Sequence, residues 1–439
     1  MTGIQTGVRA QRTCPSWRSS LAAAGSPARL RNLCPRVPLK QRRPANQGWR
    51  RAIIQAGLNN GSPDIIATEP ARSNKPLQPR PLRLGLPSKG RMAEDTIELL
   101  KNSQLTVKKI NPRQYVARIQ EIPDVEVWFQ RATDVVRKLI YGDIDLGIVG
   151  YDMYAEVAGE NDELVVVHDK LDFGQCHLAL GVPMYGWGSE IHSLDDLKAS
   201  PKFNAENPLR VVTGYVNVAR RFFTENGFEH FCLLTADGAL EAAPAMGSAD
   251  IILDLVSTGT TLKENNLKEI DGGKIISSEG ILLANRRALK ERSGILPVVK
   301  ELIERLDAHL EAEDFFSVTA NMYGSSPEEI ADRLIRSEHN LGGLTGPTIN
   351  NVYTRTADGK ASELGFYAAC ICVRKADLYK AVKELRKLGG TGVLVQPMTY
   401  IFDAETPRWK KLLKELEFTE ADIESLNISV DFDDLSKAA

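Results

Sequence analysis

Short apolar runs alternate with amphipathic stretches along the middle of the chain. The run LRLGLP (82–87) precedes an amphipathic, helix-like segment, and VEVWFQ (125–130) precedes a helical pattern over ATDVVRKLIYG (132–142). A second buried run, IDLGIVG (144–150), ends in glycine and leads into another helical pattern. Strands that alternate with helices predict a mainly parallel sheet in an α/β lobe.

The same alternation begins again further along the chain and then changes. LRVVTG (209–214) opens a second set of strand and helix patterns that includes the buried run DIILDL (250–255). Between residues 314 and 402 the order becomes strand, helix, strands, helix, strand, which is typical of a ferredoxin-like unit. We therefore expect an α/β fold with two α/β lobes around a crevice, followed by a ferredoxin-like α+β domain.

These patterns also predict domain boundaries. The expected parts are a leader and linker over 1–80, a first lobe over 81–180 plus 272–312, a second lobe over 181–271, a ferredoxin-like domain over 313–403, and a helix and tail over 404–439.

The composition indicates a folded protein that binds small molecules or other protein chains. Of the 439 residues, 43% are hydrophobic, which suffices for packed cores. The formal net charge of -2 gives no basic field of the kind that binds nucleic acid. No apolar run reaches the ~18 residues of a membrane span. Neither nucleic acid nor a membrane is expected as a partner.

The beginning of the chain differs from the rest in charge. From Met1 to Pro63 there is no Asp or Glu, while arginine recurs among Ser, Ala and Pro. This composition is typical of an organellar transit peptide, and we favour the chloroplast over the mitochondrion. A basic arm that binds an acidic partner is the alternative. The abrupt start of the strand-like run at Leu82 favours the cleaved leader.

Cysteines and histidines indicate no metal site and no general base. Cys176, Cys232, Cys370 and Cys372 lie outside the basic leader and show no CxxC or metal-ligand spacing, so reduced thiols are expected. None of the six histidines stands in a pattern typical of a catalytic base. The protein ligands of any metal ion are unknown at this stage.

A loop rich in hydroxyl groups follows the buried run that ends near Val256. The loop consists of Ser257, Thr258, Gly259, Thr260 and Thr261. Backbone N–H groups at the start of a helix, hydroxyl donors and a glycine that permits close approach suit a phosphate group. Asp254, just before the loop, could accept hydrogen bonds from sugar hydroxyls or hold a phosphate-bound Mg²⁺. An ordinary N-capping turn is the alternative reading.

Two other turns carry charged residues at the ends of expected strands. Ser88, Lys89, Gly90 and Arg91 form a strand-to-helix turn that suits an anion, although a solvated surface turn has the same pattern. Asp152 follows Gly150 at the start of a helix, where open α/β sheets bind ligands. A simple capping role is the alternative for Asp152. The chain contains neither GxxxxGK[ST] nor a GxGxxG dinucleotide motif.

Several segments, in this order, resemble the ATP phosphoribosyltransferase family. They are LPSKGR, QRATDV with GDIDLGIVGYD, LDFGQCHLAL, GALEAAP and ADIILDLVSTGTTLKENNL. The resemblance extends from about Leu82 to about Phe402, and GGLTGPTIN resembles the regulatory domain of the family's long form. It implies two periplasmic-binding-protein-like lobes and an ACT-like, ferredoxin-like regulatory domain.

The resemblance also implies an activity. Family members transfer the 5-phosphoribosyl group of phosphoribosyl pyrophosphate to N1 of the adenine of ATP and release pyrophosphate, as the first step of histidine biosynthesis. Mg²⁺ is the implied cofactor, histidine the implied inhibitor, and a homo-hexamer with an active dimer the implied assembly. Positioning and charge neutralisation are expected to supply most of the catalysis.

Roles for individual residues follow from the same resemblance. The loop from Ser257 to Thr261 is expected to bind the 5-phosphate, with Asp254 and Glu241 as the catalytic carboxylates at the ribose hydroxyls. The ATP or pyrophosphate side is expected to comprise Lys89, Gly90, Arg91, Arg131, Asp134, Gly150, Asp152, Thr213 and Tyr215. Histidine is expected to bind at Asn321, Leu344 and Thr348. Gln175 stands where some relatives have a basic residue, which argues against a charged contact there.

Two other functions fit parts of the pattern. Two α/β lobes around a crevice also form solute receptors, which close on a ligand without chemistry. A catalytically inactive regulatory subunit is the second alternative. The hydroxyl loop and the third domain argue against a receptor, and the intact SKGR and DLVSTG segments argue against an inactive subunit.

Overall fold

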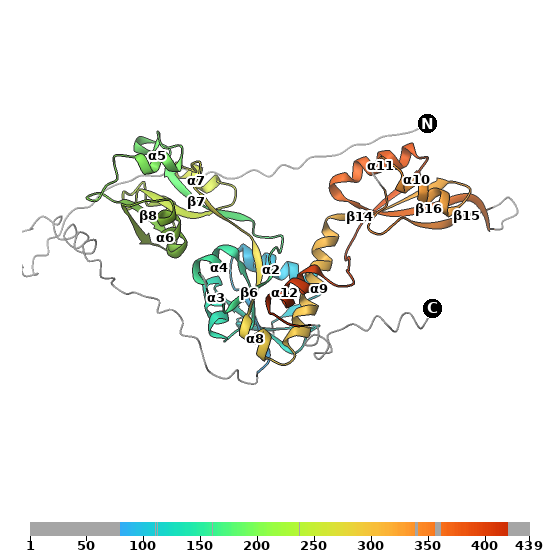
Figure 1. The fold of residues 1–439 in the computed structure, drawn as a ribbon, viewed down its shortest axis with the longest axis horizontal. Helices are drawn as coiled ribbons and strands as arrows, with labels where there is room; N and C mark the ends of the chain where they lie inside the picture. Colours follow the sequence, from blue (N-terminus) through green and yellow to red (C-terminus); the bar gives the residue numbers. More distant parts are fainter. Residues whose placement is uncertain are drawn as a thin grey trace, which may run out of the picture. The chain divides into compact units, whose positions relative to one another are not determined.

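The computed structural model describes residues 80–419, apart from residues 110, 112, 160, 237, 339–340 and 356–360. The predicted transit peptide and the polar end of the tail lie outside these residues. Within them the chain forms three sheets, each with its own helices (Figure 1). None of the described helices combines the length and apolarity that a membrane span requires.

The first lobe contains a seven-stranded sheet in the order β2-β3-β4-β1-β5-β13-β6. Its strands are β1 (Leu82–Pro87), β2 (Val107–Lys108), β3 (Val116–Ile119), β4 (Val125–Gln130), β5 (Leu146–Gly150), β6 (Leu164–His168) and β13 (Gly280–Asn285). Its helices are α2 (Arg91–Asn102), α3 (Ala132–Tyr141), α4 (Tyr151–Val157), α8 (Arg286–Glu291) and α9 (Ile295–Glu313). Strand β1 is parallel to both β4 and β5, so three strands end at one edge of this sheet.

The second lobe is built on a six-stranded sheet in the order β11-β7-β10-β8-β9, with β12 paired to β7. Its strands are β7 (Cys176–Pro183), β8 (Leu209–Thr213), β9 (Phe231–Thr235), β10 (Ile251–Val256), β11 (Leu267–Lys268) and β12 (Lys274–Ser278). Its helices are α5 (Leu194–Ala199), α6 (Val216–Glu225) and α7 (Thr260–Glu264), with 3₁₀ turns η1 (Gly186–Gly188) and η2 (Leu240–Ala242). Phe223 of α6 is fully buried in its core.

The chain passes between the two lobes at other positions than the expected boundaries at 180 and 272. Strands β7 and β12 pair with each other in the second sheet. The chain therefore leaves the first lobe between His168 and Cys176, and returns between Ser278 and Gly280. Buried strands have the same apolar pattern in either sheet, so the sequence did not assign them. Because β13 is antiparallel to β5 and β6, and β7 is antiparallel to β10, both sheets are mixed rather than mainly parallel.

The third sheet has the order β15-β16-β14-β17, which confirms the predicted ferredoxin-like domain. Its elements are β14 (Phe315–Tyr323), α10 (Pro327–Ile335), β15 (Thr348–Arg355), β16 (Ala361–Arg374), η3 (Lys375–Asp377), α11 (Leu378–Lys387) and β17 (Thr391–Pro397). Side chains of α10 and α11 share one core with Ala320 and Met322 of β14, so both helices cover the same face of the sheet (Figure 1).

The expected helix in the tail is α12 (Pro407–Glu415), and it belongs to the core of the first lobe. Trp409 of α12 is 1% exposed and lies in the same hydrophobic cluster as the strands of the first sheet. Arg408 pairs with Asp307 of α9 at 2.6 Å and with Asp169 at 3.2 Å. After the ferredoxin-like domain, the chain thus returns to the first lobe and packs there as α12.

Candidate functional site

The hydroxyl loop links strand β10 to helix α7. Gly259 has a φ of 71°, a left-handed conformation that glycine adopts without a steric penalty, and it directly precedes the first helical residue. The hydroxyl oxygens of Thr258 and Thr260 lie 3.0 Å apart. Ser257, Thr258, Thr260 and Thr261 are all exposed. The loop therefore presents hydroxyl groups and the first amides of α7 to a ligand, as a phosphate cradle requires.

Asp254 is a half-buried carboxylate on β10, immediately before this loop. Its Oδ1 accepts a hydrogen bond from the Leu255 amide at 2.8 Å. Burial, together with the negative charge of Glu241 on η2, raises the pKa of Asp254 above its usual value despite that hydrogen bond. The charged form is thus poorly satisfied in the free protein, and hydroxyl donors or a cation from a ligand would stabilise it.

Glu241 lies on a shorter element than its sequence pattern indicates. The segment ALEAAPAMG (239–247) is typical of a helix, whereas the structure has only the single 3₁₀ turn η2. Ala239 has a φ of 52° before the turn, and Pro244 and Gly247 follow it, so a longer helix cannot form.

The cationic turn lies at the carboxyl end of β1. The Ser88 amide donates to the carbonyl of Gln130 at 2.8 Å, and Gly90 has a φ of 77° before α2 begins at Arg91. Arg131 precedes the first residue of α3 at the end of the neighbouring strand β4. Lys89, Arg91 and Arg131 are exposed, and within the described residues their side chains form no ion pair or hydrogen bond. These cations remain available for a ligand.

A cavity of about 320 Å³ joins the two loops. Its lining includes four residues that the sequence predicted for the site, namely Arg91, Gly150, Asp152 and Ser257. Lys89, Gly90 and Arg131 lie in the adjoining turns and Asp134 lies in the first turn of α3, but none of them lines it. The loop end of β10 and the strand ends of the first lobe therefore meet at one cavity, although they are far apart in the sequence.

Sequence reasoning missed other residues of this lining. They are Pro87, Met92, Asp95, Ala132, Met153, Gly174, Cys176 and Leu255, and Gln175 lies there as well. Asp95 follows Arg91 by one helical turn and thus projects from the same side of α2, a spacing that could have found it. Burial raises the pKa of the Cys176 thiol, so the thiol form is favoured.

Asp152 and Tyr215, both expected on the ATP side, bond to each other. The Tyr215 hydroxyl donates to Asp152 Oδ2 at 2.9 Å, and the Ser278 hydroxyl donates to Oδ1 at 2.6 Å. Burial and the Asp152 charge raise the pKa of Tyr215, so it stays a donor. A Cβ at Gly150 would lie 2.2 Å from Asp152 Oδ1, so a larger residue at the end of β5 would displace this hydrogen-bonded carboxylate. This network connects the two lobes beside the cavity.

Thr213 was expected to face a ligand, and the structure contradicts this expectation. Its side chain is fully buried, and its hydroxyl accepts a hydrogen bond from the Tyr215 amide at 2.9 Å. Thr213 therefore supports the turn before α6 instead of contacting a substrate.

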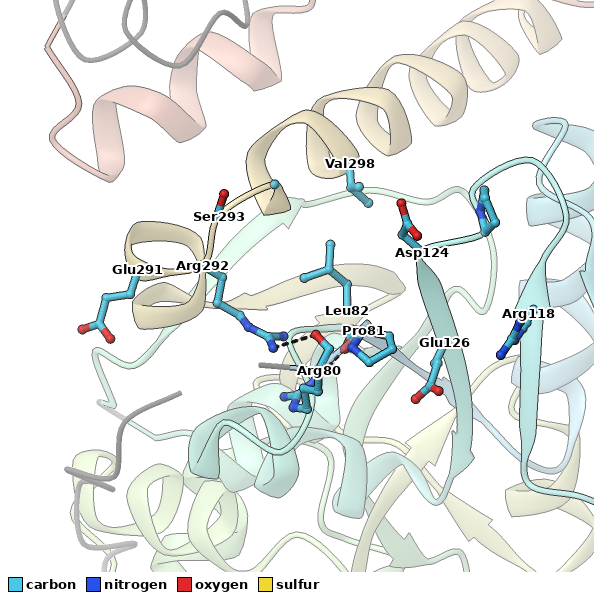
Figure 2. Close-up of a pocket in the computed structure, with 12 residues that line it drawn as sticks. Arg80, Pro81, Leu82, Arg118, Asp124, Glu126, Glu291, Arg292, Ser293 and Val298 are labelled. Carbon is cyan, nitrogen blue, oxygen red and sulfur yellow. Dashed lines mark hydrogen bonds between the residues drawn. The ribbon is translucent and has the colours of Figure 1, made fainter. Parts of the chain in front are cut away.

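A larger cavity of about 770 Å³ lies at the opposite end of β1 (Figure 2). Two of its arginines are held by Asp145, which has no exposed side-chain surface: Arg80 lies 2.8 Å and Arg292 2.7 Å from the carboxylate. Arg292 also donates to the Arg80 carbonyl at 3.0 Å, as Figure 2 shows. Here the cations stabilise the fold, and none of the residues predicted for the site lines this cavity.

The residues expected to bind histidine lie in the ferredoxin-like domain. Asn321 on β14 pairs with Ala368, and Thr348 on β15 pairs with Cys370, so both side chains alternate away from the core residues Ala320 and Ala369. They share the face of the sheet that α10 and α11 do not cover. Leu344 is 53% exposed in the loop before β15.

Comparisons with known proteins identify relatives of this chain. The family model described as ATP phosphoribosyltransferase matches residues 131–308, and the model described as HisG, C-terminal domain, matches residues 312–400. ATP phosphoribosyltransferase 1, chloroplastic, of Arabidopsis thaliana is 56% identical over 335 residues, which are 76% of this chain and 81% of the relative. The ATP phosphoribosyltransferase of Rhodopseudomonas palustris is 29% identical over 339 residues, 76% of this chain and 97% of the relative.

A solved structure titled ATP phosphoribosyl transferase (HisG:HisZ) complex from Thermotoga maritima has a TM-score of 0.41 and 23% identity, and covers 52% of this chain and 98% of that chain. The match covers 81% of the Arabidopsis enzyme at 56% identity, and the two family models match residues 131–308 and 312–400. The chain therefore belongs to the ATP phosphoribosyltransferase family.

Proposed function

We propose that the 320 Å³ cavity is where this chain carries out the ATP phosphoribosyltransferase reaction. Phosphoribosyl pyrophosphate would place its 5-phosphate on the loop from Ser257 to Thr261. The exposed cations Lys89, Arg91 and Arg131 would neutralise the pyrophosphate or the triphosphate of ATP. The observation that carries the proposal is the meeting of a hydroxyl loop and an unpaired arginine, Ser257 and Arg91, at one cavity.

The chemistry requires positioning and charge stabilisation. The bond between the anomeric carbon and the pyrophosphate oxygen breaks, and the anomeric carbon bonds to N1 of adenine. Pyrophosphate leaves with the bonding electron pair, so its oxygens gain negative charge while the ribose ring becomes cationic. Arg91 and Lys89 would stabilise the first charge, and the carboxylates of Asp254 and Glu241 would stabilise the second. Asp254 would also accept hydrogen bonds from the ribose hydroxyls.

The residues beside the loop fit a Mg²⁺ ion that arrives with the substrate. Among the described residues no group of three His, Cys, Asp or Glu side chains could hold a metal ion by itself. Mg²⁺ commonly keeps several waters and binds one or two carboxylates together with substrate phosphates. Asp254 and Glu241 supply such a pair, because burial and the Glu241 charge raise the pKa of Asp254 and a bound cation would offset that effect. The ion would neutralise the phosphates of the bound substrate.

We further propose that histidine inhibits this chain by binding in the ferredoxin-like domain. Asn321 and Thr348 offer an amide and a hydroxyl on the uncovered face of the sheet, and the loop that carries Leu344 lies beside them. Gly343 in that loop has a φ of 69°, and a Cβ there would lie 3.1 Å from the Cys372 amide nitrogen. The loop thus packs on β16 two residues from Cys370, which pairs with Thr348.

Location and assembly are the remaining parts of the proposal. The Arabidopsis relatives are named chloroplastic, and the leader of this chain is rich in arginine and free of acidic residues up to Pro63. We therefore assign the chain to the chloroplast. A homo-hexamer that contains active dimers is the proposed assembly.

Pyrophosphate release from the full chain, supplied with ATP, phosphoribosyl pyrophosphate and Mg²⁺, tests the proposed function. Release should require both substrates, fall with added histidine, and be abolished by Asp254→Ala. Asp195→Ala, at an exposed position on α5 of the same lobe, is the matched control and should retain full activity. If substrates bind and no pyrophosphate appears, the chain is a two-lobed binding protein instead.

A further inference from the structure

Helix α6 of the second lobe receives its N-terminal cap from the first lobe. Its own N-cap residue, Tyr215, forms no side-chain capping bond. The amides of Asn217 and Val218, which have no partner inside the helix, donate instead to the carboxylate of Glu156 at 3.0 Å each. Glu156 lies on α4. A carboxylate at this end of a helix also interacts favourably with the helix dipole.

The same side of α4 makes a second attachment to the second lobe. Asp152 precedes Glu156 by four residues, so both side chains project from one side of the helix. Asp152 accepts from Tyr215 and from Ser278, which lies on β12. The Asn217 side chain also donates to the Glu156 carbonyl at 2.9 Å. Helix α4 is thus fixed to the second lobe through two carboxylates.

Helix α4 is also part of the site. Gly150, Asp152 and Met153 line the 320 Å³ cavity, and Ser257 and Leu255 of the second lobe line it as well. Met153 and Ala155 pack against the core of the second lobe. The element that holds the second lobe is therefore part of the wall between the cationic turn and the hydroxyl loop.

We propose that Glu156 is a positioning residue, which, through its cap on α6, sets the separation of the hydroxyl loop from the cationic turn. The inference rests on the proposed function, because it concerns the approach of one substrate to the other. Glu156 does not line the cavity and belongs to neither loop. Its effect is exerted through α6 and the lobe that α6 belongs to.

The position of the cap predicts that its loss affects catalysis more than substrate binding. The loop from Ser257 to Thr261 remains intact without Glu156, so phosphoribosyl pyrophosphate should bind almost as before. The reacting atoms lie on groups held by different lobes, and a displacement of about 1 Å can reduce the rate by about 10²-fold. Loss of the cap should therefore lower kcat far more than it weakens binding.

The experiment compares Glu156→Ala and Glu156→Gln with wild type in the full chain. Glu225→Ala, at an exposed position at the far end of α6, is the matched control. Glu156→Ala should lower kcat by about tenfold or more, while calorimetry with Mg²⁺ should give a Kd for phosphoribosyl pyrophosphate within about twofold of wild type. Glu156→Gln keeps one acceptor oxygen and should be intermediate. The control should match wild type.

Hydrogen exchange gives a readout that does not depend on activity. The amides of Asn217 and Val218 should exchange faster in Glu156→Ala and at the wild-type rate in Glu225→Ala. Faster exchange with unchanged kcat would overturn the proposal, and so would an equal loss of kcat and affinity with a lower Tm, which indicates a merely structural role. An inactive wild type would refute the proposed function instead, while exchange would still report whether the cap exists.

Discussion

Strand β1 has a cavity at each end, and the two cavities differ in what their charged residues do. At the amino end, Arg80 and Arg292 hold the buried carboxylate of Asp145, and the cavity measures about 770 Å³. At the carboxyl end, the cavity measures about 320 Å³, and Arg91 has no protein partner among the described residues. The larger cavity uses its cations to stabilise the fold. The smaller one leaves its cation available to a ligand.

On the proposed function, uncommitted polar groups, rather than volume, distinguish the ligand-binding end of this strand. Ligands of open α/β sheets bind at the carboxyl ends of the strands, where loops can vary without disturbing the ladder. At the amino end of β1, ion pairs instead join segments that are distant in the sequence. Substitutions at the two ends should accordingly affect different properties.

The largest effect is expected at the amino end, from Asp145→Asn. The change leaves Arg80 and Arg292 without their buried anion, and the loss of one partner from such a cluster costs about 3–5 kcal/mol of unfolding free energy. Urea unfolding measures this loss. The kcat of the remaining folded protein should equal that of wild type. A large loss of kcat without a loss of stability would show that the amino-end cavity takes part in catalysis.

Asp254→Asn, next to Leu255 of the carboxyl-end cavity, should reduce activity without reducing stability. We expect kcat/KM to fall by about 10²-fold, or about 2.7 kcal/mol of transition-state stabilisation. The unliganded variant should be more stable than wild type at neutral pH, because the raised pKa of Asp254 means that the fold penalises its charge.

The size of this stability difference should depend on pH. The stabilisation that a raised carboxyl pKa provides is present below the usual value of 3.8 and is lost as the pH rises through the folded-state pKa. Wild type and Asp254→Asn should therefore have equal stability in the most acidic conditions and diverge above them. Urea unfolding across this range measures the divergence, and parallel curves at all pH values would contradict it.

Gly259→Ala should cause a smaller, mixed effect. A side chain at a φ of 71° costs roughly 1–2 kcal/mol, although a Cβ there would meet nothing closer than 3.7 Å. Gly186→Ala is the matched control, since Gly186 has a φ of 67° and open space around it. Both variants should lose similar stability, and only Gly259→Ala should also weaken the binding of phosphoribosyl pyrophosphate. Equal affinities in the two variants would argue against the phosphate role of the loop.

The smallest effect is expected from Gln175→Arg, which adds a cation to the lining of the carboxyl-end cavity. An exposed charge contact contributes about 0.2–1 kcal/mol, so pyrophosphate should bind about 1.4- to fivefold more tightly. Gln175→Glu should weaken binding by a similar factor. Competition binding measures both changes, and identical affinities would place the pyrophosphate away from Gln175.

The loops of the site could be predicted from the sequence because their residues are local. Ser257 to Thr261 and Ser88 to Arg91 follow apolar runs directly, and strand ends at one sheet edge converge. The lobe boundaries could not be predicted in the same way, because β7 and β12 are apolar strands that fit either sheet. Only the hydrogen-bonding partners of Cys176 to Pro183 decide the question.

The cross-lobe contacts were missed for a related reason. Asp152 and Glu156 have the pattern of an acidic residue in a first turn and a polar residue on a helix surface. Their partners Tyr215 and Asn217 lie about sixty residues further along, at separations of 63 and 61 residues. No local pattern shows that a helix in one lobe lacks a cap and that another lobe supplies it. Likewise Thr213, predicted to face a substrate, turned out to be fully buried.

The second lobe is an insertion between two neighbouring strands of the first sheet, and this fixes an order of folding. Strand β6 joins that sheet only through β13, which follows the whole second lobe in the chain. A nascent chain, emerging from its amino end, completes the second sheet before β13 is available. Until then neither edge of β6 is paired in this sheet, and unpaired edges promote association between chains. The pairing of β6 therefore waits until the whole inserted lobe has been synthesised.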